Sequence, residues 1–237
     1  MIHFTTRATL ALLASFTLYW LVALPLDTRT DQIQQAALGV TAWVFLGAAL
    51  ARQRHGVRVQ VAVLVVVATA LEVIGSIVWR AYVYRLDNLP LYVPAGHGLF
   101  YLVALRTAAL PRLERHARAI TVAVTAGATA WMIYGLLRSA LPDLLGLVVW
   151  AVFVRFMVRG RYPLLYAVSF VMTMALELYG TALGIWRWAP LLPGLWLPAG
   201  NPPSCIGAGY AAMDALTRRI VATARRRVPT TAAAPAA

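Results

Sequence analysis

The sequence predicts an all-α integral membrane protein with about eight transmembrane helices, built as two parallel four-helix repeats. Composition is the first reason: 61% of the 237 residues are hydrophobic and 12% are charged, whereas about a quarter of a soluble chain is charged. The second reason is the alternation of long apolar runs with short arginine clusters, and the third is an internal repeat. A soluble globular fold is therefore excluded.

Eight apolar segments are candidate membrane spans, since a helix crosses a bilayer with about 20 residues. Five have this length, at residues 8–26, 33–51, 59–79, 119–137 and 163–180, and three are shorter or interrupted, at 94–110, 141–158 and 202–221. We interpret the first as a span and not as a signal peptide, because no small-x-small cleavage site follows it.

The arginines predict the orientation of the chain, and all 21 basic residues are Arg. Sixteen lie in the N-terminus, the C-terminal tail and residues 52–58, 106–118 and 155–161, while five lie in the opposite loops. Because cytoplasmic loops are enriched in positive charge, we expect a cell-membrane protein with both termini in the cytoplasm. The net charge of +13 then reflects contact with anionic membrane lipids, and no nucleic-acid partner is expected.

Missing residue types exclude several chemistries. Without any Lys, the chain cannot form a retinal or pyridoxal Schiff base. A single Cys205 excludes intrachain disulfides and cysteine-rich zinc sites. The four His residues are scattered and have no metal-ligand spacing. We therefore expect no metal and no cofactor.

The internal repeat is visible in two pairs of segments. Residues 71–76 (LEVIGS) match residues 176–181 (LELYGT), about 105 residues later. Residues 91–97 (LYVPAGH) match residues 195–201 (LWLPAGN) at nearly the same spacing. Two matches at one spacing indicate a duplicated unit.

The repeat divides the chain into three parts. Residues 1–110 form the first four-helix repeat, residues 111–222 form the second, and residues 223–237 are a disordered basic and Ala/Pro-rich cytoplasmic tail. Because each repeat has an even number of spans, both have the same orientation, with a pseudo-twofold axis along the membrane normal.

Glu72 and Glu177 occupy matching places in the two repeats, in the outer half of the bilayer. Of the eight acidic residues, only these two lie deep within predicted spans. A carboxylate in the membrane normally faces the bundle interior and marks a functional site, although a structural glutamate that ties helices together remains the alternative. A Gly-Ser or Gly-Thr pair follows each glutamate one turn later and predicts close approach of a neighbouring helix.

His97 is where the two repeats differ, since Asn201 stands at the matching position. We expect Glu72 to meet His97 and Glu177 to meet Asn201 near the outer surface. His97 is then a candidate acid, base or ligand, and a helix-capping imidazole is the other interpretation.

Aromatic and arginine side chains follow each glutamate and are candidates for substrate binding. Aromatic rings can stabilise a developing cation, and arginine can pair with a carboxylate or an anionic headgroup. The alternative for the aromatics is an interfacial belt. The substrate-binding candidates are Trp79, Arg80, Tyr82, Trp186, Arg187, Trp188 and Asn201.

Residues 177–216 resemble membrane-bound carotenoid-biosynthesis proteins of the carotenoid hydratase type. The resemblance is in Glu177, then Gly180-Thr181, and then Trp186 and Trp188, followed by a Pro-rich turn and a last span. The resemblance implies acid chemistry on a polyene double bond, with Glu177 or Glu72 as proton donor. The PAGNPP block at 198–203 departs from the pattern.

Two functions are compatible with these features. The first is a membrane enzyme that uses Glu72, Glu177 and His97 for acid–base chemistry on a lipophilic isoprenoid or lipid substrate. The second is a proton- or cation-coupled transporter or a non-catalytic membrane subunit. The expected partners are membrane lipids and a lipophilic small molecule, and the oligomeric state stays open.

Overall fold

A computed structural model describes residues 5–138 and 141–227, and this part of the chain is mostly helical. Its α-helices are α1 (Thr6–Asp27), α2 (Gln32–Ala51), α3 (His55–Glu72), α4 (Tyr92–Ala108), α5 (Pro111–Arg115), α6 (Ala117–Arg138), α7 (Leu144–Arg159), α8 (Pro163–Ala182) and α9 (Gly209–Arg227). A π-helical segment (Val73–Val78) continues α3, a 3-10 turn (Ile206–Ala208) precedes α9, and two short strands are β1 (Tyr82–Tyr84) and β2 (Trp186–Trp188).

Five of the described helices are long and apolar enough to cross a membrane. These are α1, α2, α3 with its π-helical continuation, α6 and α8, and they coincide with the five long segments predicted from the sequence. The three shorter segments correspond to α4, α7 and α9, of 17, 16 and 19 residues. The protein is therefore a membrane-embedded, mainly helical protein.

Two boundaries near the C-terminus differ from the prediction. The predicted last span begins at residue 202, but α9 begins at Gly209. Pro202 and Pro203 keep residues 201 and 202 out of the helix, because proline restricts the preceding residue to extended conformations, and a 3-10 turn at Ile206–Ala208 comes before α9. The predicted disordered tail begins too early, since α9 continues to Arg227. Residues 228–237 lie outside the described residues.

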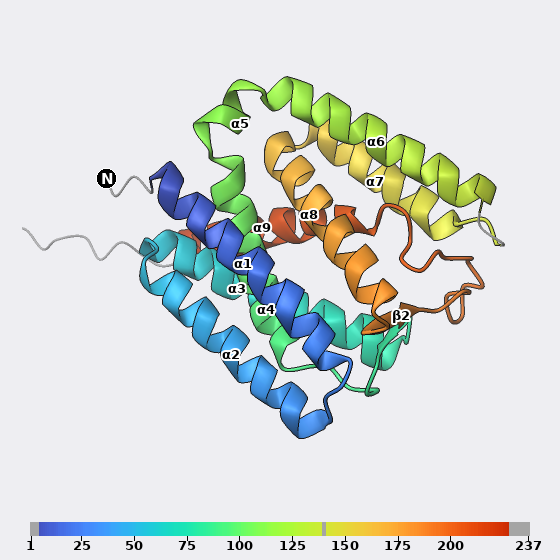
Figure 1. The fold of residues 1–237 in the computed structure, drawn as a ribbon. Coiled ribbons are helices and arrows are strands. Elements are labelled where there is room, and N and C mark those ends of the chain that lie inside the picture. Colours follow the sequence, from blue (N-terminus) through green and yellow to red (C-terminus); the bar gives the residue numbers. More distant parts are fainter. Residues whose placement is uncertain (1–4, 139–140, 228–237) are drawn as a thin grey trace, which may run out of the picture.

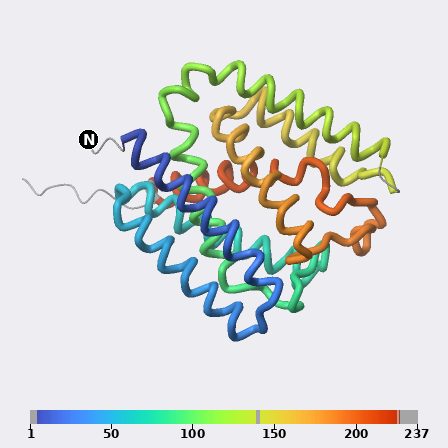
Figure 2. The backbone as a smooth tube through the Cα atoms, viewed as in Figure 1, coloured from blue at the N-terminus to red at the C-terminus, as the bar shows by residue number. Residues whose placement is uncertain are grey.

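The ends of the helices gather at two opposite ends of the molecule (Figure 1). The turn between α1 and α2, the two strands and the end of α6 lie toward the right and bottom of the view. The turns from α2 to α3, from α4 through α5 to α6, and from α7 to α8 lie toward the left and top (Figure 2). The chain thus runs back and forth between these two ends.

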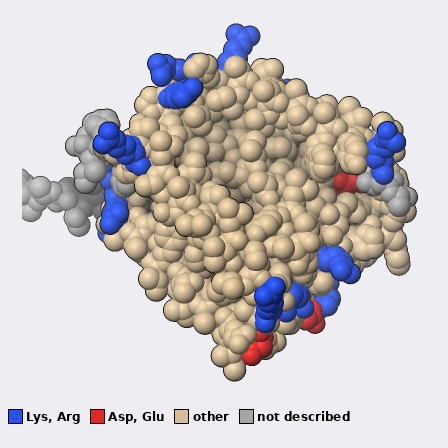
Figure 3. Space-filling model, viewed as in Figure 1, with Lys and Arg blue, Asp and Glu red and all other residues tan. Residues whose placement is uncertain are grey.

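The short helix α4 lies at the centre of the fold. It packs against α1, α2, α3 and α8, and 13 of its 17 residues are buried. The peripheral helices instead expose large apolar side chains, such as Ile33 at 82% and Leu137 at 75% exposure. One face of the molecule is almost free of charge, with arginines around its rim (Figure 3). Such a face is suited to contact with lipid.

A small antiparallel sheet joins two distant parts of the chain. Tyr82 lies opposite Trp188 and Tyr84 lies opposite Trp186. The pairing continues beyond the strands, since the Arg85 amide donates to the Ile185 carbonyl at 2.8 Å. This sheet is an addition to the predicted all-α fold, and it lies where residues that follow α3 meet residues that follow α8.

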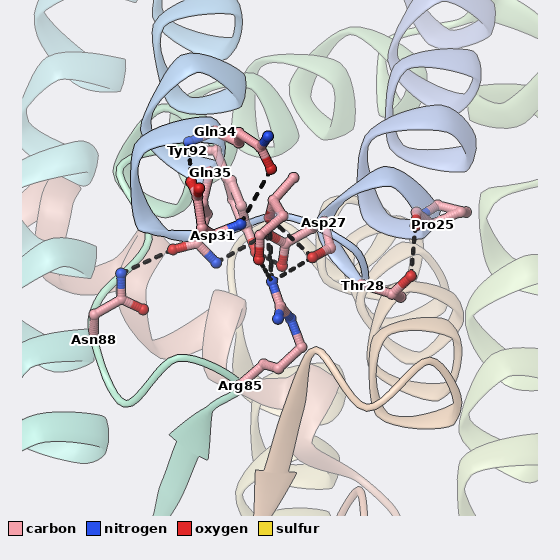
Figure 4. Close-up of polar contacts among 10 residues, drawn as sticks. Pro25, Asp27, Thr28, Asp31, Gln34, Gln35, Arg85, Asn88 and Tyr92 are labelled. Carbon is pink, nitrogen blue, oxygen red and sulfur yellow. Dashed lines mark hydrogen bonds and ion pairs between the residues drawn. The ribbon is translucent and has the colours of Figure 1, made fainter.

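A buried carboxylate at the end of α1 fixes the segment between β1 and α4 (Figure 4). Asp27 is fully buried. It accepts hydrogen bonds from the Gln35 amide at 2.9 Å and the Tyr92 hydroxyl at 3.1 Å, and Arg85 lies 3.6 Å from its Oδ1. Hydrogen bonds and an ion pair offset the cost of burying a charge, so Asp27 is a structural acid.

Asp143 has a similar role in the second half of the chain. This buried residue caps α7 by accepting from the Gly146 amide at 2.9 Å. It also accepts from the amides of Gly200 at 2.9 Å and Ser204 at 2.6 Å. Each half therefore uses one aspartate at a helix terminus to hold the irregular segment that leads to its last helix.

Candidate functional site

A cavity of about 510 Å³ lies among α3, α4, α8 and α9, with aromatic residues of both strands in its wall. Its volume is within the range of small-molecule sites, roughly 300–1,000 Å³. Most of the lining is apolar, including Trp20, Leu24, Phe100 and Met213. The acidic residues in the lining are Glu72 and Glu177, accompanied by His97 and the tyrosines Tyr82, Tyr84, Tyr92 and Tyr210.

The cavity reaches the lateral surface of the molecule. Leu71 of α3 and Leu216 of α9 both line it and are 47% and 46% exposed. The lining of the cavity thus includes side chains that are also part of the outer surface of the molecule.

Glu72 lies at the end of α3, where the helix changes to π-helical geometry. Its Oε2 accepts from the Tyr82 hydroxyl at 2.7 Å and from the Tyr84 hydroxyl at 2.9 Å. Its Oε1 lies 3.0 Å from His97 Nε2. Both oxygens therefore have partners, an arrangement suited to an ionised carboxylate. π-Helical segments are frequent at functional sites.

His97 connects Glu72 to Tyr210 through a chain of hydrogen bonds. Its Nδ1 lies 2.7 Å from the Tyr210 hydroxyl, and its Nε2 lies 3.0 Å from Glu72. Tyr210 stacks on Phe100 with ring centroids 4.1 Å apart, which fixes the phenol in place. In a neutral imidazole with its proton on Nε2, that nitrogen donates to the carboxylate and Nδ1 accepts from the phenol. This chain can hold or transfer a proton.

Glu177 of α8 has a different set of donors. Its Oε2 accepts from the indole Nε1 groups of Trp186 at 2.9 Å and Trp188 at 3.2 Å. Within residues 5–138 and 141–227, Oε1 of Glu177 has no hydrogen-bond partner. Because both indole N–H groups donate to Oε2, the second oxygen is left available to carry a proton.

Each glutamate belongs to the same local arrangement. In each half, two aromatic side chains that alternate along a strand donate to one carboxylate oxygen. One turn after the glutamate, the Ser76 hydroxyl donates to the Glu72 carbonyl at 2.8 Å, and the Thr181 hydroxyl donates to the Glu177 carbonyl at 2.6 Å.

The two glycines after the glutamates do not have the predicted role. A Cβ atom on Gly180 would lie 1.9 Å from the Trp186 ring, and one on Gly75 would lie 3.0 Å from the Tyr82 ring. The space beside each glycine is occupied by a strand aromatic and not by a neighbouring helix. Both glycines therefore let an aromatic donor reach its glutamate.

The structure brings together six of the ten residues predicted from the sequence. The residues that line the cavity are Glu72, Tyr82, His97, Glu177, Trp186 and Trp188. The predicted contact between Glu72 and His97 is present at 3.0 Å. The predicted contact between Glu177 and Asn201 is wrong, because Asn201 Oδ1 instead accepts from the Trp188 backbone amide at 2.9 Å.

The other four predicted residues do not line the cavity. Arg80 pairs with Asp87 at 2.9 Å, so it does not pair with a glutamate. Arg187 is exposed on β2, and Trp79 donates to the Pro193 carbonyl at 2.8 Å. Asn201 contacts the backbone of β2 and not the cavity. The strand backbone explains the position of Arg187. Residues i and i+2 of a strand share one face, so Trp186 and Trp188 point into the cavity and Arg187 points the opposite way.

Tyr84, Tyr92 and Tyr210 line the cavity but are not among the predicted site residues. Tyr84 has a sequence signal, because it lies two residues after Tyr82 as Trp188 lies two residues after Trp186. Tyr210 has no such signal, since only the packing of α9 against α3 brings it to His97. Among the described residues, no group of three His, Cys, Asp or Glu residues has metal-site geometry.

Comparison of the chain with protein-family models, with curated proteins and with solved structures gave no match. The functional assignment therefore depends on the residues and geometry of the cavity.

Proposed function

We propose that the protein is a membrane enzyme that performs carboxylate acid–base chemistry on a lipophilic substrate of the isoprenoid or lipid class. One observation carries the proposal: Glu72, His97 and Glu177 line a single, mostly apolar cavity. Apolar walls with a few convergent polar groups are typical of ligand sites. They suit a hydrocarbon chain better than a hydrated ion, which favours the enzyme over the cation-coupled transporter.

The proposed topology has eight membrane crossings in the cell membrane, with residues 1–110 and 111–222 as two parallel repeats and both termini in the cytoplasm. It is supported by the arrangement of helix ends in two groups (Figure 1). The matching glutamate–aromatic arrangements support the repeat. The strand register supports it as well, because each aromatic position of β1 lies opposite the other aromatic position of β2, as a twofold axis requires.

Glu177 is the proposed proton donor. Its Oε1 has no partner among the described residues, and two indoles hold the other oxygen. In the proposed reaction, Oε1–H gives its proton to one carbon of a carbon–carbon double bond, and the neighbouring carbon becomes cationic. The rings of Tyr82 and Trp188, whose centroids are 4.6 Å apart, lie in the cavity wall and can stabilise that cation.

Glu72 and His97 are the proposed base. A water molecule adds its oxygen to the cationic carbon, and the Glu72–His97 pair takes the proton that this water releases. Return of that proton to Glu177 restores the site, so the net change is addition of one water across one double bond. The resemblance of residues 177–216 to carotenoid hydratases favours a polyene substrate and agrees with this reaction class.

The proposal is tested by comparing lipid and pigment extracts from cells with and without the gene, and from cells with Glu177→Gln or Glu72→Gln. We expect a lipophilic product that depends on both glutamates. Asp87→Asn is the matched control, because Asp87 is an exposed carboxylate whose side chain is 68% accessible.

Conversion must also occur with purified protein in detergent, where no membrane separates two compartments. An unchanged lipid and pigment profile for all variants would overturn the proposal that the protein is an enzyme. Proton or cation uptake into proteoliposomes that depends on Glu72 and Glu177 would then favour the transporter.

A further inference from the structure

A second hollow, of about 1,040 Å³, lies at the opposite end of the molecule from the strands. It lies between the end of α7, the turn to α8, the start of α3 and the second half of α9. We call it the arginine cleft, because among the described residues five arginines and no carboxylate line it. These arginines are Arg155, Arg159, Arg161, Arg218 and Arg219.

One of these arginines is fixed in place. Arg218 Nε lies 2.8 and 2.9 Å from the two oxygens of buried Asp214, as the i, i+4 spacing predicts. Its guanidinium also lies over the Tyr162 ring, 4.0 Å from the centroid. Asp214 also accepts from the Tyr101 hydroxyl, and Gln60 donates to Tyr101 at 2.5 Å. These contacts position Arg218 and Gln60, both of which line the cleft.

Three other arginines are available to a ligand. Arg155, Arg159 and Arg219 are exposed, and none has a hydrogen bond or ion pair with another part of the described chain. Like charges around one hollow repel each other unless an anion lies between them. Guanidinium groups bind phosphate with two parallel hydrogen bonds, so the lining has the chemistry of a phosphate site.

The arginine cleft adjoins the apolar cavity. Ala212 and Leu216 of α9 line both. On α3, Gln60 lines the cleft and Glu72 lines the cavity, a separation of about 18 Å at 1.5 Å per residue. One elongated molecule can therefore occupy both hollows.

We propose that the arginine cleft binds the phosphate or diphosphate headgroup of an amphiphile whose hydrocarbon chain enters the apolar cavity. The proposal rests on the proposed function for the fate of the chain, while headgroup binding can be measured without any reaction. It assigns the substrate to the phosphate-headed isoprenoids or lipids.

Binding is measured with purified full-length protein in non-ionic detergent, using Glu177→Gln to prevent turnover. The probes are farnesyl diphosphate, farnesol, inorganic diphosphate and phosphatidylglycerol, and the readout is isothermal calorimetry. We expect farnesyl diphosphate to bind at least about tenfold more tightly than farnesol or inorganic diphosphate. If phosphatidylglycerol displaces farnesyl diphosphate at a similar concentration, the phosphate-headgroup site is supported, and its natural occupant is a bulk membrane lipid.

The decisive variant is Arg159→Gln with Arg219→Gln, which we expect to weaken farnesyl diphosphate binding at least about tenfold and to leave farnesol binding unchanged. Arg115→Gln with Arg118→Gln is the matched control, because it removes the same charge from exposed residues outside the cleft. Unchanged affinity in the cleft variant, or binding of inorganic diphosphate as tight as that of farnesyl diphosphate, would overturn the proposal.

This outcome is separable from that of the proposed function. If the cleft variant binds farnesyl diphosphate as tightly as the protein with the native arginines, while Glu177→Gln abolishes the lipophilic product in cells, the headgroup site fails and the acid–base enzyme stands. If headgroup binding is present and Glu177→Gln changes no lipid in the cell, the headgroup site stands and the acid–base enzyme fails.

Discussion

Glu72 and Glu177 occupy matching places in the two halves of the chain, but their carboxylates have different partners. Glu72 accepts from two phenols and lies 3.0 Å from an imidazole, so both of its oxygens are occupied. Glu177 accepts from two indoles on one oxygen. Each glutamate is thus held by two aromatic side chains of the strand that follows it, and the choice of neighbouring side chains gives one carboxylate three partners and the other two.

This difference is the basis for proposing the acid in one half and the base in the other. A carboxylate with both oxygens hydrogen-bonded is suited to remain ionised, while a carboxyl group with one unpartnered oxygen can present a proton to a substrate. The four predictions below test the comparison, beginning with the largest expected effect.

Glu177→Gln removes the proposed acidic proton but keeps an acceptor for the two indoles. We expect turnover of the lipophilic substrate to fall about 10²–10⁴-fold, the usual contribution of a general acid. Glu72→Gln should have a smaller effect, because a carbocation reacts with water even without a strong base. Initial rates normalised to protein amount provide the measurement. A larger loss for Glu72→Gln would reverse the assignment of acid and base.

His97→Asn gives the first half the residue found at the matching sequence position in the second half. We expect the rate to fall about 10²-fold, or about 2.7 kcal/mol in activation free energy, because Glu72 and Tyr210 both lose their bond to the imidazole. The control is His116→Asn, since His116 is exposed and the one hydrogen-bond partner of its ring among the described residues is the Arg112 carbonyl. A wild-type rate for His97→Asn would limit His97 to a structural role.

Gly180→Ala and Gly75→Ala compare the packing of the two strand aromatics. We expect Gly180→Ala to destabilise the protein by about 1–3 kcal/mol, because the new Cβ would lie 1.9 Å from the Trp186 ring. Gly75→Ala should cost less, since its Cβ would lie 3.0 Å from Tyr82. Thermal unfolding in detergent measures both.

Gly127→Ala is the control for these two variants, because no atom lies within 4 Å of the added Cβ and the residue is inside α6. It should leave stability unchanged or raise it by up to about 1 kcal/mol. Equal unfolding temperatures for Gly180→Ala and Gly127→Ala would contradict the proposed contact with Trp186.

Arg80→Gln and Arg187→Gln should have the smallest effects. Neither arginine lines the cavity, and the Arg80–Asp87 pair is exposed. An exposed ion pair contributes about 0–1 kcal/mol, so we expect nearly unchanged stability and rates within about twofold of wild type. A tenfold loss of rate in either variant would show that these arginines contact the substrate after all.

The sequence predicts the helices and the acidic residues well. Long apolar segments give a strong signal, and the two glutamates are conspicuous because intramembrane acids are rare. The contact between Glu72 and His97 also follows from the sequence, because both residues lie toward the same end of their predicted helices. These features depend on local composition and on helix geometry.

Features that depend on long-range packing are not predictable in the same way. Strands of three residues are too short to give a periodic pattern, so the pairing of β1 with β2 is missed. The segments 91–97 and 195–201 have similar sequences, yet the first begins α4 and the second is irregular, because Pro202 and Pro203 follow only the second. The arginine cleft combines residues from α3, α7 and α9. The sequence predicts that these segments lie on the cytoplasmic side but does not predict that they form one cleft.

The pairing of β1 with β2 has a consequence for the origin of the protein. An antiparallel pair of tripeptides in this register is self-complementary, as at the interface of a twofold homodimer. Two identical four-helix subunits could therefore have associated through the same strands and enclosed one cavity with two equivalent glutamates. Under the proposed two-repeat architecture, fusion into a single chain would have let the two copies diverge, so that only one has an imidazole beside its glutamate. Such a symmetric ancestor would have had two like carboxylates, whereas the present chain has an asymmetric pair.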